Sequence, residues 1–156
     1  MSITLLKYSL VILHIITASA WFGLGLRLAG QARSAVEAGP ERGKALVHST
    51  ARNVTLMNWF ALLTFVLGLG TLFAGGGFAV YGWPYHASIT LILLLVLAQY
   101  FVIRPGWATL ESALGTDSDA AQSAVKRIAA GTGAGHLLWL VTLVLMYLRQ
   151  FGIGVG

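Results

Sequence analysis

ITLLKYSLVILHIITASAWFGLGL, residues 3–26, is an apolar run that only Lys7 and His14 interrupt. As a helix it would rise about 36 Å, at about 1.5 Å per residue, which exceeds the roughly 30 Å hydrocarbon core of a bilayer. Three more apolar stretches follow it along the chain. We therefore expect four transmembrane helices, at about residues 3–27, 54–74, 86–103 and 129–148.

The composition of the whole chain supports a membrane protein. Hydrophobic residues make up 57% of its 156 residues and charged residues only 10%, whereas about a quarter of the residues in soluble domains are charged. We predict a single transmembrane domain over residues 1–156, an all-α integral membrane four-helix bundle. The chain has no cysteine. This excludes disulfides and iron–sulfur clusters, so any metal centre must use histidine, methionine or oxygen ligands.

Basic residues are distributed unevenly along the chain. Lys7 and Arg149 lie at its two ends, and the other eight lie in two long polar segments between spans: Arg27, Arg33, Arg42, Lys44, Arg52, Arg104, Lys126 and Arg127. The positive-inside rule puts these segments in the cytoplasm, and both the N- and C-termini on the periplasmic side of a bacterial inner membrane. We expect no nucleic acid partner, because the basic residues form no stripe interleaved with aromatic residues. The expected partner is the lipid bilayer, and a homo-oligomer or a membrane complex with other subunits stays open.

Turn and cap residues mark where the predicted spans end. We expect residues 27–52 to form an aqueous loop around the turn pair Gly39-Pro40, with residues 41–53 as a helical lead-in to the second span. Arg104-Pro105 is expected to close the third span. The segment Thr116–Asp119 offers N-caps for a short amphipathic helix that ends at residues 126–127.

The four histidines are the main clue to function. Ionisable side chains inside a bilayer are costly, face the bundle interior and are functional candidates, and neutral imidazole is a natural ligand of haem iron or copper. His14 lies 13 residues inside the basic end of its span, His136 lies nine and His86 lies 18, whereas His48 lies outside the second span. His14 with His86, or His14 with His136, could therefore ligate one metal ion. For His48 and His86 an interfacial role is the simpler interpretation.

Other polar and small residues suggest contacts between helices. Arg52 could pair with a haem propionate or act only as a positive-inside anchor, and the sequence favours neither. Gln99 and Tyr100 could form hydrogen bonds between helices. The spacing of small residues predicts close helix packing at two pairs, Gly131/Gly135 and Ser19/Gly23.

The first predicted helix resembles that of a known family. Leu13–Ile16 (LHII), followed by Ala20–Leu24 (AWFGL) and Arg27, is similar to the opening helix of the HemJ-type protoporphyrinogen oxidases and the related CopD-like membrane proteins. Arg52 before the second span and Trp83-x-x-His86 at the start of the third extend the resemblance. It implies a four-helix protein that binds haem b, with His14 matching the family's first-helix histidine.

The sequence departs from the HemJ pattern at three places. Ser88-Ile89 stands where a lysine is expected after the third-helix histidine, Tyr100-Phe101 stands where the pattern has Tyr-His, and the first helix has no second histidine at its end. These differences concern the enzymatic reaction more than haem binding.

Three functional classes follow from these observations. The leading hypothesis is a haem b-binding membrane protein, an oxidoreductase that acts in electron transfer or in haem-pathway oxidation. The alternatives are a CopD-like protein that transports or handles copper, and a non-catalytic structural subunit of a membrane complex. Copper handling is disfavoured because Met57 and Met146 are the only methionines beyond Met1, whereas copper(I) sites favour clusters of soft ligands.

Overall fold

The computed structural model describes residues 3–151, apart from the side chains of residues 149 and 150. Within this range the chain forms helices and short turns, with no strand. The helices are α1 (Ile3–Glu37), α2 (Pro40–Ala74), α3 (Trp83–Ala98), α4 (Arg104–Ala113) and α5 (Ser118–Tyr147), with a π-helical segment η1 (Gln99–Ile103) between α3 and α4 and a final 3₁₀ turn η2 (Leu148–Phe151). The side chain of Arg149, assigned above to the same face as Lys7, lies outside the described residues.

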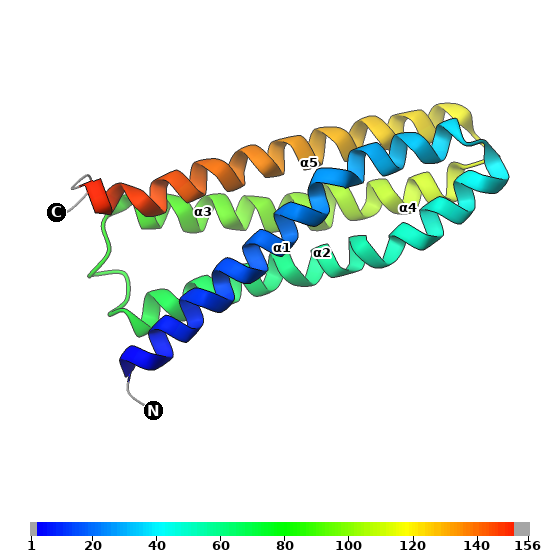
Figure 1. Ribbon diagram of the computed structural model, residues 1–156. Coiled ribbons are helices and arrows are strands. Elements are labelled where there is room, and N and C mark those ends of the chain that lie inside the picture. The colour runs from blue at the N-terminus through cyan, green and yellow to red at the C-terminus, as the bar shows by residue number, and fades with distance from the viewer. Residues whose placement is uncertain (1–2, 152–156) are drawn as a thin grey trace.

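The helices form an elongated antiparallel bundle (Figure 1). α1 and α2 make one hairpin, whereas α3, η1 and α4 run as one continuous rod beside α5. Ile3 and Phe151 lie at one end of the bundle, which we call the terminal end. The α1–α2 and α4–α5 connections lie at the other, which we call the turn end.

Four helical rods are long and apolar enough to cross a membrane: Ile3–Glu37, Pro40–Ala74, Trp83–Ala113 and Ser118–Tyr147. Large apolar side chains such as Ile12, Leu137 and Val144 point outward and are about half exposed or more. Exposed apolar surface of this extent is expected where the solvent is lipid. The predicted all-α, multi-pass four-helix architecture is therefore confirmed.

The aqueous loop predicted at residues 27–52 is wrong, because α1 continues to Glu37, whereas the helical lead-in predicted at residues 41–53 is confirmed as the start of α2. α1 and α2 have 35 residues each, and only Ala38 and Gly39 separate them. Gly39 has a φ of +79°, a conformation that favours glycine, and Pro40 opens α2. A helix of 35 residues spans about 52 Å, so about 20 Å extends beyond the hydrocarbon core. The end of an apolar run marks where a helix leaves lipid, which need not be where the helix stops.

The third helix also passes its predicted end at Arg104-Pro105. Proline lacks the N–H that would bond the carbonyl four residues earlier, that of Phe101. The guanidinium of Arg127 on α5 donates to this carbonyl at 2.6 Å, and the N–H of Arg104 donates to the carbonyl of Gln99 in the π-helical register. The helix continues because a neighbouring helix satisfies the carbonyl that proline leaves without a donor.

The predicted cap at Thr116–Asp119 is confirmed, but the short helix after it is wrong. The carboxylate of Asp117 accepts hydrogen bonds from the N–H groups of Asp119 at 3.0 Å and Ala120 at 2.9 Å. α5 then runs for 30 residues without a break at 126–127. Apolar residues recur at helical spacing along its polar first part, so α5 buries one side there before it enters the apolar span.

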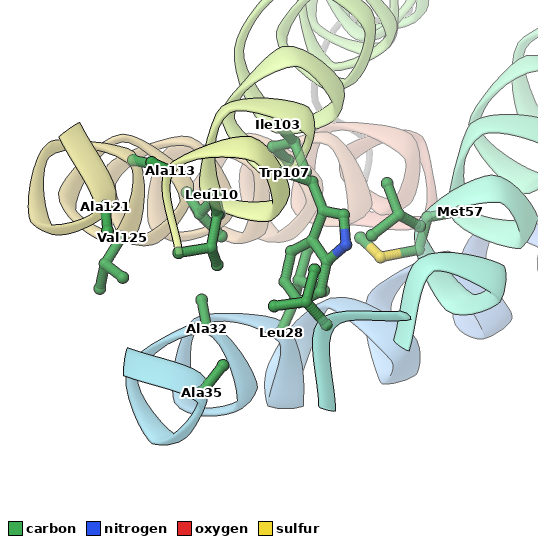
Figure 2. Packing of buried hydrophobic residues seen from close by; sticks show 14 of the residues in the cluster. Leu28, Ala32, Ala35, Met57, Ile103, Trp107, Leu110, Ala113, Ala121 and Val125 are labelled. Carbon is green, nitrogen blue, oxygen red and sulfur yellow. The ribbon is translucent and has the colours of Figure 1, made fainter. Parts of the chain in front are cut away.

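The turn end holds most of the hydrophobic core, and we call it the packed half. Figure 2 shows Ala32 of α1 pointing towards Leu110 of α4, with Val125 of α5 beside them. Small residues let these helices approach closely: the Cα of Gly43 packs against the carbonyl of Ala35. Buried residues of this half include Leu28, Ala32, Ala35, Val47, Ile103, Trp107, Leu110, Ala113, Leu114, Ala121, Ala124, Val125 and Ile128.

Candidate functional site

The terminal end contains a cavity of about 680 Å³ between α1, α2, α3 and α5, and we call this end the hollow half. Cofactor and small-molecule sites usually occupy about 300–1,000 Å³. Most of the lining is apolar or aromatic. The lining includes Lys7, His14, Trp21, Thr64, Phe65, Gly68, Leu69, Tyr85, Leu95, Trp139, Thr142, Met146 and Tyr147.

His14 is the one predicted ligand that lines this cavity. Its Nδ1 lies 2.8 Å from the backbone carbonyl oxygen of Thr64 on α2. Because a carbonyl can only accept, this contact assigns the ring proton to Nδ1 and leaves the lone pair on Nε2. A backbone carbonyl on the second nitrogen is the usual support of a histidine that ligates a metal.

Two neighbours fit the His14 ring into the helix interface. A Cβ on Gly68 would lie 3.0 Å from Cε1 and 3.2 Å from Nδ1 of His14, so a larger residue there would press on the ring. The hydroxyl of Thr64 donates to that of Thr17 at 3.1 Å, which joins α1 and α2 one turn from His14. α2 therefore positions the imidazole through the carbonyl of Thr64 and the close approach of Gly68.

His136 lies outside the cavity lining, between α1 and α5. Its ring packs against Trp21, with centroids 5.8 Å apart, and against Phe22, with centroids 4.8 Å apart. Its Nε2 is buried without a hydrogen bond, although the backbone of Phe22 is close enough to interact with the ring. A Cβ on Gly25 would lie 2.7 Å from this nitrogen. The glycine thus makes the space in which His136 packs.

His86, His48 and Arg52 all lie exposed and apart from the cavity lining. His86 is at the start of α3, where its Nε2 lies 3.4 Å from the carbonyl oxygen of Phe78. His48 and Arg52 are on the part of α2 nearer the turn end. Across residues 3–151 no group of three or more His, Cys, Asp or Glu residues is placed to hold a metal ion. The structure thus brings none of the other predicted site residues into the cavity with His14.

Several cavity residues were not predicted from the sequence. Lys7 lines the cavity from α1, Met146 from α5 and Tyr85 from α3. Thr142 is 6% exposed, and its hydroxyl has no hydrogen-bond partner. One signal was present in the sequence: Lys7 and His14 are seven residues apart, which places them on the same face of a helix.

A buried polar network closes the inner end of the cavity. The indole N–H of Trp21 donates to Oε1 of Gln99 at 3.1 Å, and Nε2 of Gln99 donates to Oδ1 of Asn58 at 2.7 Å. Tyr100 adds a longer contact of 3.5 Å from its hydroxyl to the carbonyl of Asn58. The predicted hydrogen bonds between helices are therefore confirmed, and Gln99 joins three of the four rods.

Glycine contacts hold α5 against this network. A Cβ on Gly135 would lie 2.8 Å from Cη2 of Trp21, and one on Gly131 would lie 3.0 Å from Cγ1 of Ile103. The predicted close packing at Gly131/Gly135 is confirmed. The same prediction for Ser19/Gly23 is wrong, because both residues are exposed and a Cβ on Gly23 would have no neighbour within 4 Å. Small residues at this spacing favour close packing only on the face that meets another helix.

The site can thus offer one oriented imidazole, one thioether and one ammonium group to a molecule in an apolar cavity. Such a set suits a cofactor or ligand with a large apolar body better than a hydrolytic reaction, which would need a nucleophile and a base in contact. The resemblance to HemJ-type proteins stays a prediction. Comparisons of the chain with models of protein families, with curated proteins and with solved structures found no match.

Proposed function

We propose that this chain is a membrane protein that binds haem b in the cavity of the hollow half and acts in electron transfer or haem-pathway oxidation. The observation that supports it best is the orientation of His14 by the Thr64 carbonyl at 2.8 Å within the cavity lining. In this proposal Nε2 of His14 would hold the iron. Bound haem supplies reversible one-electron chemistry, and the chain's residues tune it.

The lining residues fit a flat, largely apolar group. Trp21, Phe65 and Trp139 bring aromatic surface to the cavity from three helices. Met146 is the one methionine in the described lining, and its thioether would be a second group able to hold the iron. The hydrogen bond from His14 to Thr64 makes the imidazole a stronger ligand. Exclusion of water by the apolar walls strengthens every charge interaction inside the cavity.

A difference spectrum of the purified protein tests this proposal. In mild detergent, the reduced-minus-oxidised spectrum should show a Soret band and a b-type α-band, and His14→Ala should lose both. His48→Ala is the matched control, because His48 is exposed and away from the cavity lining. His86→Ala and His136→Ala test the other two predicted ligands. Added imidazole should restore the bands to folded His14→Ala.

Two results would contradict haem binding through His14. One is a wild-type protein without either band after expression with ample haem supply. The other is a His14→Ala variant with unchanged haem content and spectrum. Retention of the bands in every variant except His136→Ala would move the iron site to the α1–α5 interface, where Nε2 of His136 has no hydrogen bond.

Copper handling is the second candidate function. Its supporting observation is that one imidazole and one thioether, those of His14 and Met146, line the same cavity. Both are ligands that copper(I) accepts. Metal analysis of the same preparations distinguishes the two candidates, because copper that is retained by the wild type and lost in Met146→Leu, without haem bands, would favour copper.

For the orientation we propose that the turn end faces the cytoplasm of a bacterial inner membrane, on the basis of its eight basic residues. Because the chain has no cysteine, single cysteines can report each side. In intact cells a membrane-impermeant maleimide should label Val80→Cys and not Ser49→Cys, both at exposed positions. The reverse pattern would invert the proposed topology. A second copy or another subunit would bind the protein while its turn end faces the cytoplasm.

A further inference from the structure

Lys7 is the one lysine, arginine, aspartate or glutamate among the described residues that line the cavity. It lies on α1, is partly buried, and shares the lining with mostly apolar groups. A cation in such surroundings is costly unless an anion or water accompanies it. An anionic group bound in the cavity would therefore stabilise the ammonium group of Lys7.

The chain itself has no acidic side chain near this end of the bundle. Its five carboxylates lie at the turn end, on the end of α1, the start of α2, the end of α4 and the cap and first turn of α5: Glu37, Glu41, Glu111, Asp117 and Asp119. All five acidic side chains thus belong to the packed half, and the hollow half has none. None of the five carboxylates is therefore placed to pair with Lys7, and an anionic partner for it would be part of a bound molecule.

The cavity also has polarity along its length. Lys7 lies about 10 Å from the level of His14 along α1, towards the terminal end, and Tyr85 and Tyr147 line the cavity at that same end. Trp21 and Leu95 line the opposite, inner end. This lining is complementary to a ligand with an apolar body at the inner end and an anionic group at the terminal end.

We propose that the cavity binds an amphipathic molecule with a carboxylate group, which pairs with Lys7 while the apolar body fills the space as far as Trp21. This inference rests on the proposed use of the cavity as a ligand site. If the ligand is haem, its propionate edge faces Lys7 and the terminal end. Arg52, the propionate partner considered from the sequence, lies outside the cavity lining.

Binding of iron-free porphyrins tests the pairing without any metal ligation. The full chain in phosphatidylcholine nanodiscs is titrated with protoporphyrin IX and with its dimethyl ester, and tryptophan quenching reports binding. The wild type should bind the diacid about tenfold more tightly than the ester, as expected for a charged hydrogen bond. Lys7→Gln should bind both equally, and Lys7→Arg should keep the preference. Lys126→Gln, at an exposed position on α5, is the control.

A second arm uses oleate and methyl oleate, which have the same carboxylate chemistry on a different body. A Lys7-dependent preference for oleate, with neither porphyrin bound, would support the carboxylate site and contradict the haem proposal. His14→Ala should keep the acid preference, because His14 contacts the ligand elsewhere. Full acid preference in Lys7→Gln, or no preference by the wild type in either arm, would overturn the inference. Unchanged ester binding by Lys7→Gln shows that the variant is folded.

Discussion

The packed half and the hollow half are built from the same four rods. Side chains fill the space between the rods in the packed half, whereas the hollow half encloses a cavity of about 680 Å³. In the packed half, small residues such as Ala32, Gly43 and Ala121 let helices approach until their side chains interlock. In the hollow half, large residues such as Trp21 and Trp139 stand around the space between the helices. The difference shows that close packing is concentrated at one end of the bundle and that the space for the proposed ligand lies at the other.

The two halves also differ in the solvent around them. The polar outer surface of the packed half, which carries Arg33, Arg42 and Glu41, belongs in water, where burial of apolar surface drives association. The hollow half is surrounded by lipid, in which helix association depends on close packing and hydrogen bonds. In the hollow half, hydrogen bonds between helices such as Thr64–Thr17 therefore carry a larger share of the helix association.

The largest effect that we expect distinguishes the two halves directly. Leu110→Ala removes a fully buried side chain of the packed half and should lower the free energy of unfolding by about 2–5 kcal/mol. Leu69→Ala, in the cavity wall, should cost about 1 kcal/mol or less because its side chain is only partly buried. Unfolding of the detergent-solubilised protein, followed by tryptophan fluorescence, measures both. Equal losses would mean that the cavity is filled in the ligand-free protein.

A second pair of variants tests the boundary between the halves. Gly135→Ala should destabilise the protein by about 1–3 kcal/mol through overpacking against Trp21. Gly133→Ala, where a Cβ would have no neighbour within 4 Å, should be neutral or stabilise by up to about 1 kcal/mol through helix propensity. The same unfolding measurement applies. A stable Gly135→Ala variant would show that Trp21 can move into the cavity without cost.

The smallest effect concerns the polar network at the inner end of the cavity. Gln99→Leu leaves Trp21 and Asn58 without their hydrogen bonds and should cost about 1–2 kcal/mol, the upper range for such bonds within membranes. Tyr100→Phe is the control, since its hydroxyl makes only a contact of 3.5 Å, and it should change stability by less than about 0.5 kcal/mol. If both variants match the wild type, the network contributes little to the separation of the halves.

The sequence predicted the number of spans because each one is a long apolar run. It predicted the helical lead-in at residues 41–53 but missed that residues 27–37 continue α1, where only one side of the helix is buried, at Leu28, Ala32 and Ala35. It also missed the continuation at Pro105, which depends on Arg127 from a helix 22 residues later in the chain. Contacts between distant helices have no local pattern.

The candidate site was predicted only in part, for a similar reason. His14 stood out because it is an ionisable residue deep within an apolar run, and the structure places it in the cavity wall. Lys7 was interpreted only through membrane topology, and Met146 only as one of too few methionines. Whether a residue lines a cavity depends on where helices diverge, and hydropathy does not record this.

The hydrogen bond from Arg127 to the Phe101 carbonyl fixes the alignment of two rods. If α5 slid along α3 and α4 by even one residue, the guanidinium of Arg127 would lose its hydrogen bond to that carbonyl. Gly131, one turn further along α5, packs against Ile103 and opposes the same sliding. Together, the Arg127 and Gly131 contacts fix the register of α5 against the rod formed by α3, η1 and α4. The walls that these two rods contribute to the cavity therefore have a defined position relative to each other.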